Sequence, residues 1–337
     1  MAKKLIRYLF WVLFGVLAVF IFISGYLFLG IAKPAEKITW GVTFGQSQAK
    51  DLGLDWKETY MALLDDMRVR NFRLPVYWDE LEPQKDEYDF APWDFQLQEL
   101  KKRDGKAILV IGFKLPRWPE CRFPSWYQGL SEEEKSARLF KMLRVVVMHY
   151  KNDPTIWAWQ VENESLLRFG VCPSRDKELL DDELYLVREL DPSRPIIVSD
   201  TGENSFWIEA GQRANIIGST LYRVIHNPTL GYVHYPYPPV MYYRKMLWAR
   251  WLFPLDDVIF SEVQAEPWVV QPPISRYSLQ DQYKTMSPDM LADNIAYVRQ
   301  TGFDTAYLWG AEWWYWTKVK GGDDKVWNEM QAVFQDK

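Results

Sequence analysis

Two glutamates of this chain follow apolar runs that are typical of buried strands. Glu164 comes shortly after the run Ile156–Val161, and Glu262 falls in the run Val258–Val263. A carboxylic acid at the end of a buried strand, beside aromatic rings, has a raised pKa and can protonate a departing oxygen near neutral pH. A second carboxylate facing it completes the acid and nucleophile pair that glycoside hydrolysis needs. Glu164 is therefore the candidate acid, and Glu262 is the candidate nucleophile.

The candidate nucleophile has a competitor four residues further along. Glu266 is followed by Pro267 and Trp268, and a proline cannot donate to a strand ladder, so the chain is expected to leave the sheet there. Extended residues advance about 3.3 Å each, which separates Glu262 from Glu266 by up to about 13 Å along the chain. Only one of them can then lie at the retaining distance from Glu164. We predict Glu262 as the nucleophile, with Glu266 and Trp268 lining a neighbouring subsite.

An arginine, a tyrosine and an asparagine accompany these carboxylates. Arg73 lies inside the apolar run Asn71–Pro75, where a buried cation is costly unless an anion is paired with it. The pair is either purely structural or orients a catalytic carboxylate, and the surrounding pattern favours the second interpretation. Tyr222, at the exit of a later apolar run, can hydrogen-bond the nucleophile. Asn163, beside Glu164, offers an amide to a sugar hydroxyl.

Aromatic residues are unusually abundant, with 18 Trp, 19 Tyr and 18 Phe in the chain. Flat apolar rings fit the C–H faces of sugars, so this composition favours a carbohydrate ligand, although any single Trp is equally well explained as core. Aromatic residues crowd the exit of the run Thr305–Trp309, and Trp309 is the best candidate for the floor of a sugar subsite. The segment Lys114–Cys121 is expected to form a wall of the same cleft.

Short apolar runs alternate with helical patterns after residue 37, which predicts parallel strands joined by helical crossovers. The eight candidate strands are Ile38–Thr43, Asn71–Pro75, Ala107–Phe113, Ile156–Val161, Pro195–Ser199, Ile216–Leu221, Val258–Val263 and Thr305–Trp309. The candidate helices are Asp55–Val69, Phe95–Arg103, Ser131–His149, Lys177–Leu190, Val240–Leu252, Pro288–Gln300 and Asp324–Phe334. This is the pattern of an α/β fold, the (β/α)8 TIM barrel, whose chemistry lies at the carboxyl ends of the strands. A doubly wound open sheet is the alternative, but no glycine-rich turn follows the first strand.

Residues 1–36 are expected to form a region separate from a barrel domain at 37–337. The apolar run Tyr8–Ala32 is long enough to cross a hydrocarbon core of about 30 Å with some tilt. Three basic residues precede it, Lys3, Lys4 and Arg7. By the positive-inside rule the N-terminus stays in the cytoplasm and the barrel is exported. A cleaved signal peptide is the alternative, but the run exceeds a normal signal-peptide core. We expect a single-pass transmembrane helix in the cell membrane.

The amino-acid composition limits which partners and cofactors the chain is expected to bind. A net charge of −5 argues against nucleic acid. The chain has three histidines, and its two cysteines are far apart, so a His/Cys metal centre is not expected. We predict no metal and no cofactor. Cys121 and Cys172 either form a disulfide outside the cytoplasm or remain free thiols.

In their order along the chain, these pieces resemble the clan A glycoside hydrolases, the cellulase-like (family 5 type) and β-galactosidase-like TIM barrels. The matching pieces, which span residues 38–316, are Arg73, Trp78…Glu82-Pro83…Tyr88-Asp89-Phe90, Asn163-Glu164, Tyr222, Ser261-Glu262 and Trp309. The resemblance implies that Glu164 is the acid/base and Glu262 the nucleophile. It also implies that Asn163 contacts the sugar 2-hydroxyl, and that Arg73 and Tyr222 hold the nucleophile.

The sequence therefore predicts a membrane-anchored retaining β-glycosidase that hydrolyses O-glycosidic bonds of a β-linked oligo- or polysaccharide. The predicted substrate contacts are Arg73, Trp78, Asn163, Tyr222, Glu266, Trp268 and Trp309. The predicted partners are this carbohydrate and the lipid bilayer, through residues 8–32. The alternatives are a catalytically inactive barrel that binds glycans and a transglycosylase that uses the same site. An inactive barrel would not need both carboxylates, and this chain keeps both.

Overall fold

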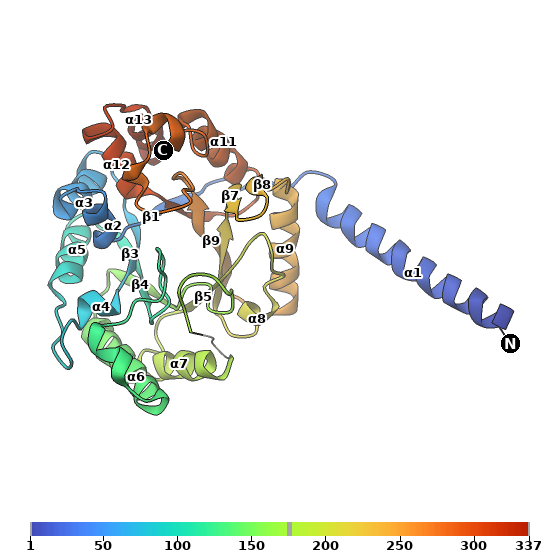
Figure 1. Cartoon of the computed structure of the whole chain (residues 1–337), viewed down its shortest axis with the longest axis horizontal. Coiled ribbons are helices and arrows are strands. Elements are labelled where there is room, and N and C mark those ends of the chain that lie inside the picture. Colours follow the sequence, from blue (N-terminus) through green and yellow to red (C-terminus); the bar gives the residue numbers. More distant parts are fainter. Residues whose placement is uncertain (1, 174–176, 336–337) are drawn as a thin grey trace.

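A closed barrel of eight parallel strands forms the centre of the computed structural model, which describes residues 2–173 and 177–335 (Figure 1). The strands are β1 Thr39–Thr43, β2 Asn71–Pro75, β3 Lys106–Ile111, β4 Ile156–Val161, β5 Ile196–Asp200, β6 Ile216–Leu221, β9 Asp257–Gln264 and β10 Thr305–Trp309. They follow one another around the barrel in chain order, and β10 closes it by pairing with β1. The predicted (β/α)8 TIM barrel is confirmed, and each predicted strand is found within two residues of its bounds.

Helices surround the strands and separate them from solvent (Figure 1). They are α2 Gln46–Asp51, α3 Trp56–Asp65, α4 Trp78–Leu81, α5 Ala91–Lys101, α6 Glu132–Tyr150, α7 Lys177–Leu190, α8 Ile208–Gly211, α9 Pro239–Leu252, α10 Leu279–Gln282, α11 Pro288–Arg299, α12 Ala311–Val319 and α13 Lys325–Gln335. Two short 3-10 helices occupy Ser125–Gly129 and Ile274–Arg276. The Asp55 side chain caps α3 by accepting from the backbone N–H of Lys57 and Glu58. The helix ends before the predicted Val69, because Arg68 adopts a left-handed φ of 64°.

Several elements outside the barrel strands were not predicted. They include the short helices α2, α4, α8 and α10, and two larger features, a hairpin and helix α12. β7 (Val224–Asn227) and β8 (Gly231–His234) form an antiparallel hairpin between β6 and α9. Strands of four residues are too short for a clear alternating pattern. The aromatic segment after β10 folds as α12, which begins after Gly310 at a φ of 130°. Both features lie in connections that follow barrel strands.

Alternation along the strands separates the barrel interior from the layer beneath the helices. In β3, Ile108 and Val110 belong to a small cluster inside the barrel, whereas Leu109 and Ile111 join the larger core. Arg73 of β2 pairs in register with Ile108. Residues in register share a face of the sheet, so Arg73 also points into the barrel.

The N-terminal helix α1 (Ala2–Phe28) projects away from the barrel (Figure 1). Its last turn packs on α9, where the ring of Tyr26 stacks on Trp248 with centroids 5.6 Å apart. The segment Lys4–Phe28 has a mean hydropathy of 2.4 over its most apolar window. By length and composition it is one helix that could cross a membrane, a test that an N-terminal signal sequence also passes.

Candidate active site

Both carboxylate oxygens of Glu262, in β9, are held by donors from other strands of the barrel. Arg73 Nη1 donates to Glu262 Oε1 at 2.9 Å, and the Tyr222 hydroxyl donates to Oε2 at 2.8 Å. The side chains of Arg73 and Glu262 are 0% and 3% exposed. A buried ion pair is tolerable only when its remaining donors and acceptors are satisfied. The carboxylate is therefore fixed in one orientation, which is what an attacking group requires.

The other donors of Arg73 reach β4. Its Nε donates to Gln160 Oε1 at 2.8 Å, and its Nη2 donates to Asn163 Oδ1 at 2.7 Å. Because the amide oxygen of Asn163 is committed to Arg73, its Nδ2 group is the end left to donate to a ligand. Arg73 thus links β2, the exit of β4 and the Glu262 carboxylate in β9.

Glu164 follows β4 with its backbone held from two sides. Its N–H donates to Ser199 Oγ at 2.8 Å, and its carbonyl accepts from Lys114 Nζ at 2.8 Å. These contacts hold a left-handed φ of 41°, which a non-glycine residue adopts only when its surroundings impose it. Burial, and then the charges of Glu262 and Glu120, raise the pKa of the Glu164 carboxyl well above its ordinary value. It therefore keeps its proton to higher pH and can act as a proton donor.

Glu162, the other carboxylate at the end of β4, has a structural role. Its two oxygens accept from the backbone N–H of Phe113 at 3.1 Å and of Lys114 at 2.6 Å. Gly112 leaves room for this carboxylate, since a Cβ there would stand 2.4 Å from the Glu162 carboxyl carbon. Glu162 therefore ties the start of the β3 loop to β4.

Glu266, the competitor of Glu262, is held by a different set of donors. Arg117 donates to Glu266 Oε1 and, at 2.9 Å, to Glu312 Oε2. Trp309 Nε1 donates to the same Glu266 oxygen at 2.8 Å. The Arg117 guanidinium also stacks on Trp309, 3.9 Å from the ring centroid. Trp309, the predicted floor of a subsite, can therefore offer a sugar only the face or edge that Arg117 leaves free.

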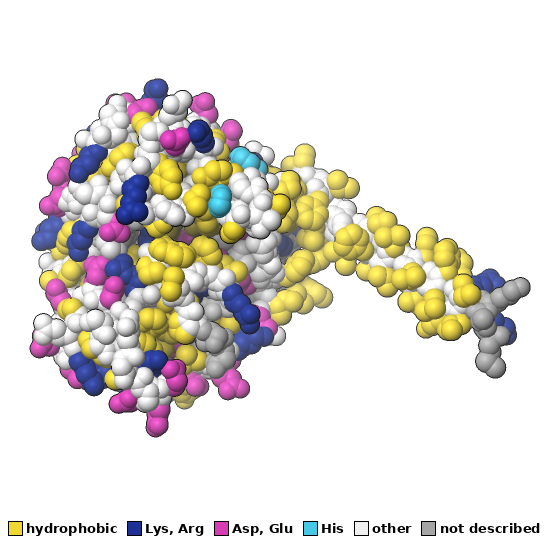
Figure 2. All heavy atoms as spheres, viewed as in Figure 1, with side chains coloured by type: hydrophobic (Ala, Val, Ile, Leu, Met, Phe, Trp, Pro, Cys, Tyr) yellow, Lys and Arg dark blue, Asp and Glu magenta, His cyan; other side chains and the backbone are white. Residues whose placement is uncertain are grey.

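A row of aromatic rings leads from the surface toward the nucleophile. The ring centroids of Trp118 and Phe169, and those of Phe169 and Trp268, are 6.2 Å apart, and Trp268 lies 5.6 Å from Tyr222. Trp118 is 54% exposed. In the space-filling view, hydrophobic side chains gather around the middle of the barrel face (Figure 2). The predicted contact Trp268 lies in this row, and Trp118 belongs to the segment predicted as a cleft wall, whereas Phe169 was not identified from the sequence.

Trp78, a predicted substrate contact, does not reach the site. Its ring is fully buried in the core, and its Nε1 donates to Glu82 Oε2 at 2.7 Å. It packs edge-on against Trp126 and Tyr127. These contacts leave no surface for a sugar, so this position corrects the prediction, and Trp78 serves the packing of α4.

Known proteins resemble this chain in sequence and in fold. No family model matches the chain. A β-1,4-xylanase of Dictyoglomus thermophilum is 28% identical over 134 residues, which are 36% of this chain and 35% of that protein. The chain thus matches about a third of the length of this relative.

Solved structures of glycosidases match nearly the whole chain. The native xylanase 10B from Thermotoga maritima has a TM-score of 0.56 at 15% identity, covering 89% of this chain and 97% of that one. A β-galactosidase from the psychrophilic Marinomonas ef1 has a TM-score of 0.56 at 11% identity, covering 88% and 59%. An endo-1,4-β-D-mannanase from Thermotoga petrophila RKU-1 has a TM-score of 0.52 at 15% identity, covering 80% and 87%. The chain therefore shares the TIM-barrel fold of these glycosidases. In this fold, functional residues are expected at the carboxyl ends of the strands, where Glu164 and Glu262 lie.

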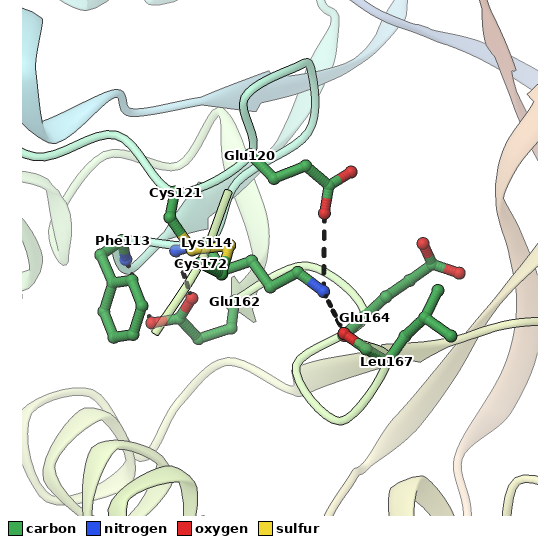
Figure 3. The surroundings of a disulfide bond; sticks show 8 residues. All are labelled: Phe113, Lys114, Glu120, Cys121, Glu162, Glu164, Leu167 and Cys172. Atoms are coloured by element: carbon green, nitrogen blue, oxygen red, sulfur yellow. Dashed lines mark hydrogen bonds and ion pairs between the residues drawn. A yellow bond between two sulfur atoms is a disulfide. The ribbon is translucent and has the colours of Figure 1, made fainter. Parts of the chain in front are cut away.

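The loop after β3 contributes charged residues that sequence reasoning identified only as part of a cleft wall. Lys114 Nζ donates to the carbonyls of Glu164 and Leu167 at 2.8 Å each, and lies 3.5 Å from Glu120 Oε2 (Figure 3). That distance exceeds an ordinary hydrogen bond, and Glu120 Oε2 makes none within the part of the chain that the structure describes. Burial raises the pKa of Glu120 to about 7. Glu120 is therefore a third carboxyl whose charge acts on the candidate pair.

A disulfide joins the loop after β3 to the loop after β4. Cys121 and Cys172 are bonded, with their Cα atoms 5.2 Å apart (Figure 3). Of the two alternatives that the sequence left open, the structure has the disulfide. A crosslink between residues 51 positions apart stabilises a fold by about 4 kcal/mol in the chain-entropy model. It also fixes Glu120, the preceding residue, against the segment that begins at Glu164.

Proposed function

We propose that this chain is a membrane-anchored retaining β-glycosidase, which hydrolyses the O-glycosidic bonds of a β-linked oligo- or polysaccharide by double displacement. The observation that carries the proposal is the pair of buried carboxyls in contrasting surroundings. Glu262 is held by a cation and a hydroxyl donor, whereas the pKa of Glu164 is raised by burial and by neighbouring carboxylates. Such contrast separates the roles of two carboxyl groups in one site.

In the first step, a Glu262 oxygen attacks the anomeric carbon and the glycosidic C–O bond breaks. Glu164 gives its proton to the departing oxygen, so the leaving group departs as an alcohol. Arg73 and Tyr222 hold Glu262 against rotation as its charge passes into the new ester bond. The Nδ2 group of Asn163 can donate to a sugar hydroxyl beside the reacting carbon.

In the second step, the ionised Glu164 takes a proton from water, and the water oxygen attacks the anomeric carbon. The ester bond to Glu262 breaks and its carboxylate is released. The proton taken from water leaves Glu164 in the protonated form in which it began. The two inversions leave a product of the same anomeric configuration as the substrate. The donors from Arg73 and Tyr222 then receive the restored charge of the leaving carboxylate.

Two features support a β-linked chain of several sugars as the substrate. The similar proteins are named as a β-1,4-xylanase, an endo-1,4-β-D-mannanase and a β-galactosidase. The aromatic row from Trp118 to Tyr222 offers stacking surface beyond a single sugar. Because the Arg117 guanidinium stacks on Trp309, only part of the Trp309 ring can contact the sugar at the reacting position.

A substrate screen tests the proposal. The full-length protein in detergent would be incubated with xylan, mannan, galactan, cello-oligosaccharides and aryl β-glycosides, and the anomer first released would be read by proton NMR. We expect turnover of at least one substrate with a β-anomeric first product. The double variant Glu164→Gln/Glu262→Gln gives the background. A folded protein that binds glycans without any turnover would favour the inactive barrel, and longer products would favour the transglycosylase.

We also propose that α1 stays in the membrane and that the barrel lies on its outer side. Lys4 and Arg7 precede the apolar part of α1, which favours a cytoplasmic N-terminus. The disulfide between Cys121 and Cys172 supports an oxidising, extracytoplasmic location for the barrel.

The proposed topology predicts a specific protease result. The chain should remain in the membrane pellet after an alkaline carbonate wash. Protease added to right-side-out vesicles should digest the barrel, because it faces the outside, and inside-out vesicles should protect it. Release by carbonate would indicate a cleaved segment, and the reverse protection pattern would contradict the orientation.

The pH profile offers a test of the third carboxyl. Glu120→Gln should move the alkaline limb of kcat/KM to lower pH, because the ionised Glu120 is one of the charges that raise the pKa of Glu164. Glu164 must be protonated to act as the acid, so activity falls as pH rises through its pKa. The pKa of Glu120 is about 7, so its charge is present in the alkaline range. Glu132→Gln, on the exposed face of α6, is the control, and an alkaline limb that stays in place in Glu120→Gln would contradict the coupling.

A further inference from the structure

One face of α9 is divided between contact with α1 and solvent. Arg244, Leu247, Trp248 and Trp251 are spaced so that they share a face of the helix. The first part of this stripe is covered, because Tyr26 of α1 stacks on Trp248 and lies beneath the Arg244 guanidinium at 4.5 Å. The second part is uncovered. Leu247 is 40% exposed and Trp251 is 82% exposed.

The uncovered part belongs to a larger apolar area. Leu252 is more than half exposed, as are Phe206 and Ile208 at the start of α8, which packs on α9. Figure 2 shows hydrophobic side chains continuing from the base of α1 along the side of the body where α9 lies. Of the three basic residues of α9, Arg244 lies on this stripe over Tyr26, whereas Lys245 is buried and Arg250 pairs with Asp257. α9 has no acidic residue. An apolar and aromatic helix face with an arginine at its edge has the composition of a surface that meets lipid headgroups.

The length of α1 determines where the surface of the bilayer would lie relative to the barrel. Tyr8 is the first residue after the basic N-terminal segment. A helix needs about 20 residues to cross a hydrocarbon core of about 30 Å. A span that begins at Tyr8 therefore ends in the turn that contains Tyr26 and Leu27. That turn is the one that packs on α9. If α1 crosses the membrane, no length of helix separates the bilayer surface from the body.

We propose that the α9 face, defined by Leu247, Trp251 and Leu252, rests in the headgroup region of the bilayer that α1 crosses. Trp and Arg side chains are suited to this depth, where an apolar ring and a polar group are both accommodated. The occupant of the face is therefore the lipid surface, and the barrel is held against the membrane at two points. This inference rests on the proposed membrane anchor and is independent of the proposed glycosidase activity.

A single added cysteine can report the depth of this face. Both native cysteines are in the disulfide, so Trp251→Cys in the full chain can be labelled selectively with an environment-sensitive nitrobenzoxadiazole dye under non-reducing conditions. Glu132→Cys, on the exposed start of α6, is the matched control. Each labelled protein would be reconstituted into phosphatidylcholine and phosphatidylglycerol liposomes, with and without doxyl-labelled lipid.

The expected result is a blue-shifted emission at position 251 that doxyl lipid quenches, with an unshifted and unquenched emission at position 132. Flotation of the liposomes after a carbonate wash reports the anchor separately. A protein that floats while its two labels behave alike would overturn the proposal for the face and leave the anchor intact. A protein that does not float would overturn both. The disulfide and the barrel fold would be checked in both variants by circular dichroism and thiol titration.

Discussion

Glu262→Ala should lower kcat/KM by a factor on the order of 10⁵ or more, the scale of loss when a covalent nucleophile is removed. Without the carboxylate the anomeric carbon has no group to form the glycosyl-enzyme bond, and the Arg73 and Tyr222 donors lose their acceptor. Azide should restore turnover of an activated aryl β-glycoside and give a glycosyl azide of inverted configuration, because the small anion enters the space left by the carboxylate. The measurement is steady-state kinetics with and without azide.

Glu266→Ala is the comparison for that result. Glu266 is held by Arg117 and Trp309, so its loss should disturb substrate positioning and raise KM, with a smaller effect on turnover than Glu262→Ala. Azide should not rescue it. If Glu266→Ala were the variant that azide restores, and Glu262→Ala retained most of its activity, the two roles would have to be exchanged.

Glu164→Gln should separate substrates according to their leaving groups. General acid catalysis contributes about 10²–10⁴-fold, and it matters most when the departing oxygen is a poor leaving group. We expect a loss of that order with natural oligosaccharides and a much smaller loss in the first step with activated aryl glycosides. Kinetics with a series of aryl β-glycosides of increasing leaving-group pKa would show a steeper dependence in the variant. Equal losses across the series would mean that Glu164 is not the acid.

The barrel and the centre of the site could be predicted because local and tertiary signals agree. β4 (Ile156–Val161) and β10 are apolar runs bounded by turn-forming residues, and both appear with the predicted bounds. Arg73 was informative because a charge in a buried strand requires an anion. Its side chain meets Glu262 in the barrel interior, as the sequence indicated.

Charges supplied by the loops were harder to predict. Arg117 and Glu120 adopt left-handed φ values of 91° and 70°. Contacts with residues that are distant in the sequence hold this backbone conformation, which determines where the two side chains point. Local sequence does not specify such a conformation for a non-glycine residue. Lys114 was part of a predicted wall, but only the folded loop shows it binding the carbonyl of Glu164. Trp78 was predicted to contact the substrate, but its ring lies in the core. An aromatic residue beside acidic residues has the same sequence pattern whether it lines a cleft or fills the core.

The most direct test of the account is to trap the glycosyl-enzyme intermediate. A 2-deoxy-2-fluoro β-glycoside, of the sugar that the screen identifies, slows the second step more than the first and leaves a covalent ester. Mass spectrometry of the labelled protein and of its peptides should show one sugar per chain, attached at Glu262, and no label on the Glu262→Gln variant. A label on Glu266, or turnover of the parent substrate without any covalent label, would contradict Glu262 as the nucleophile of a retaining enzyme.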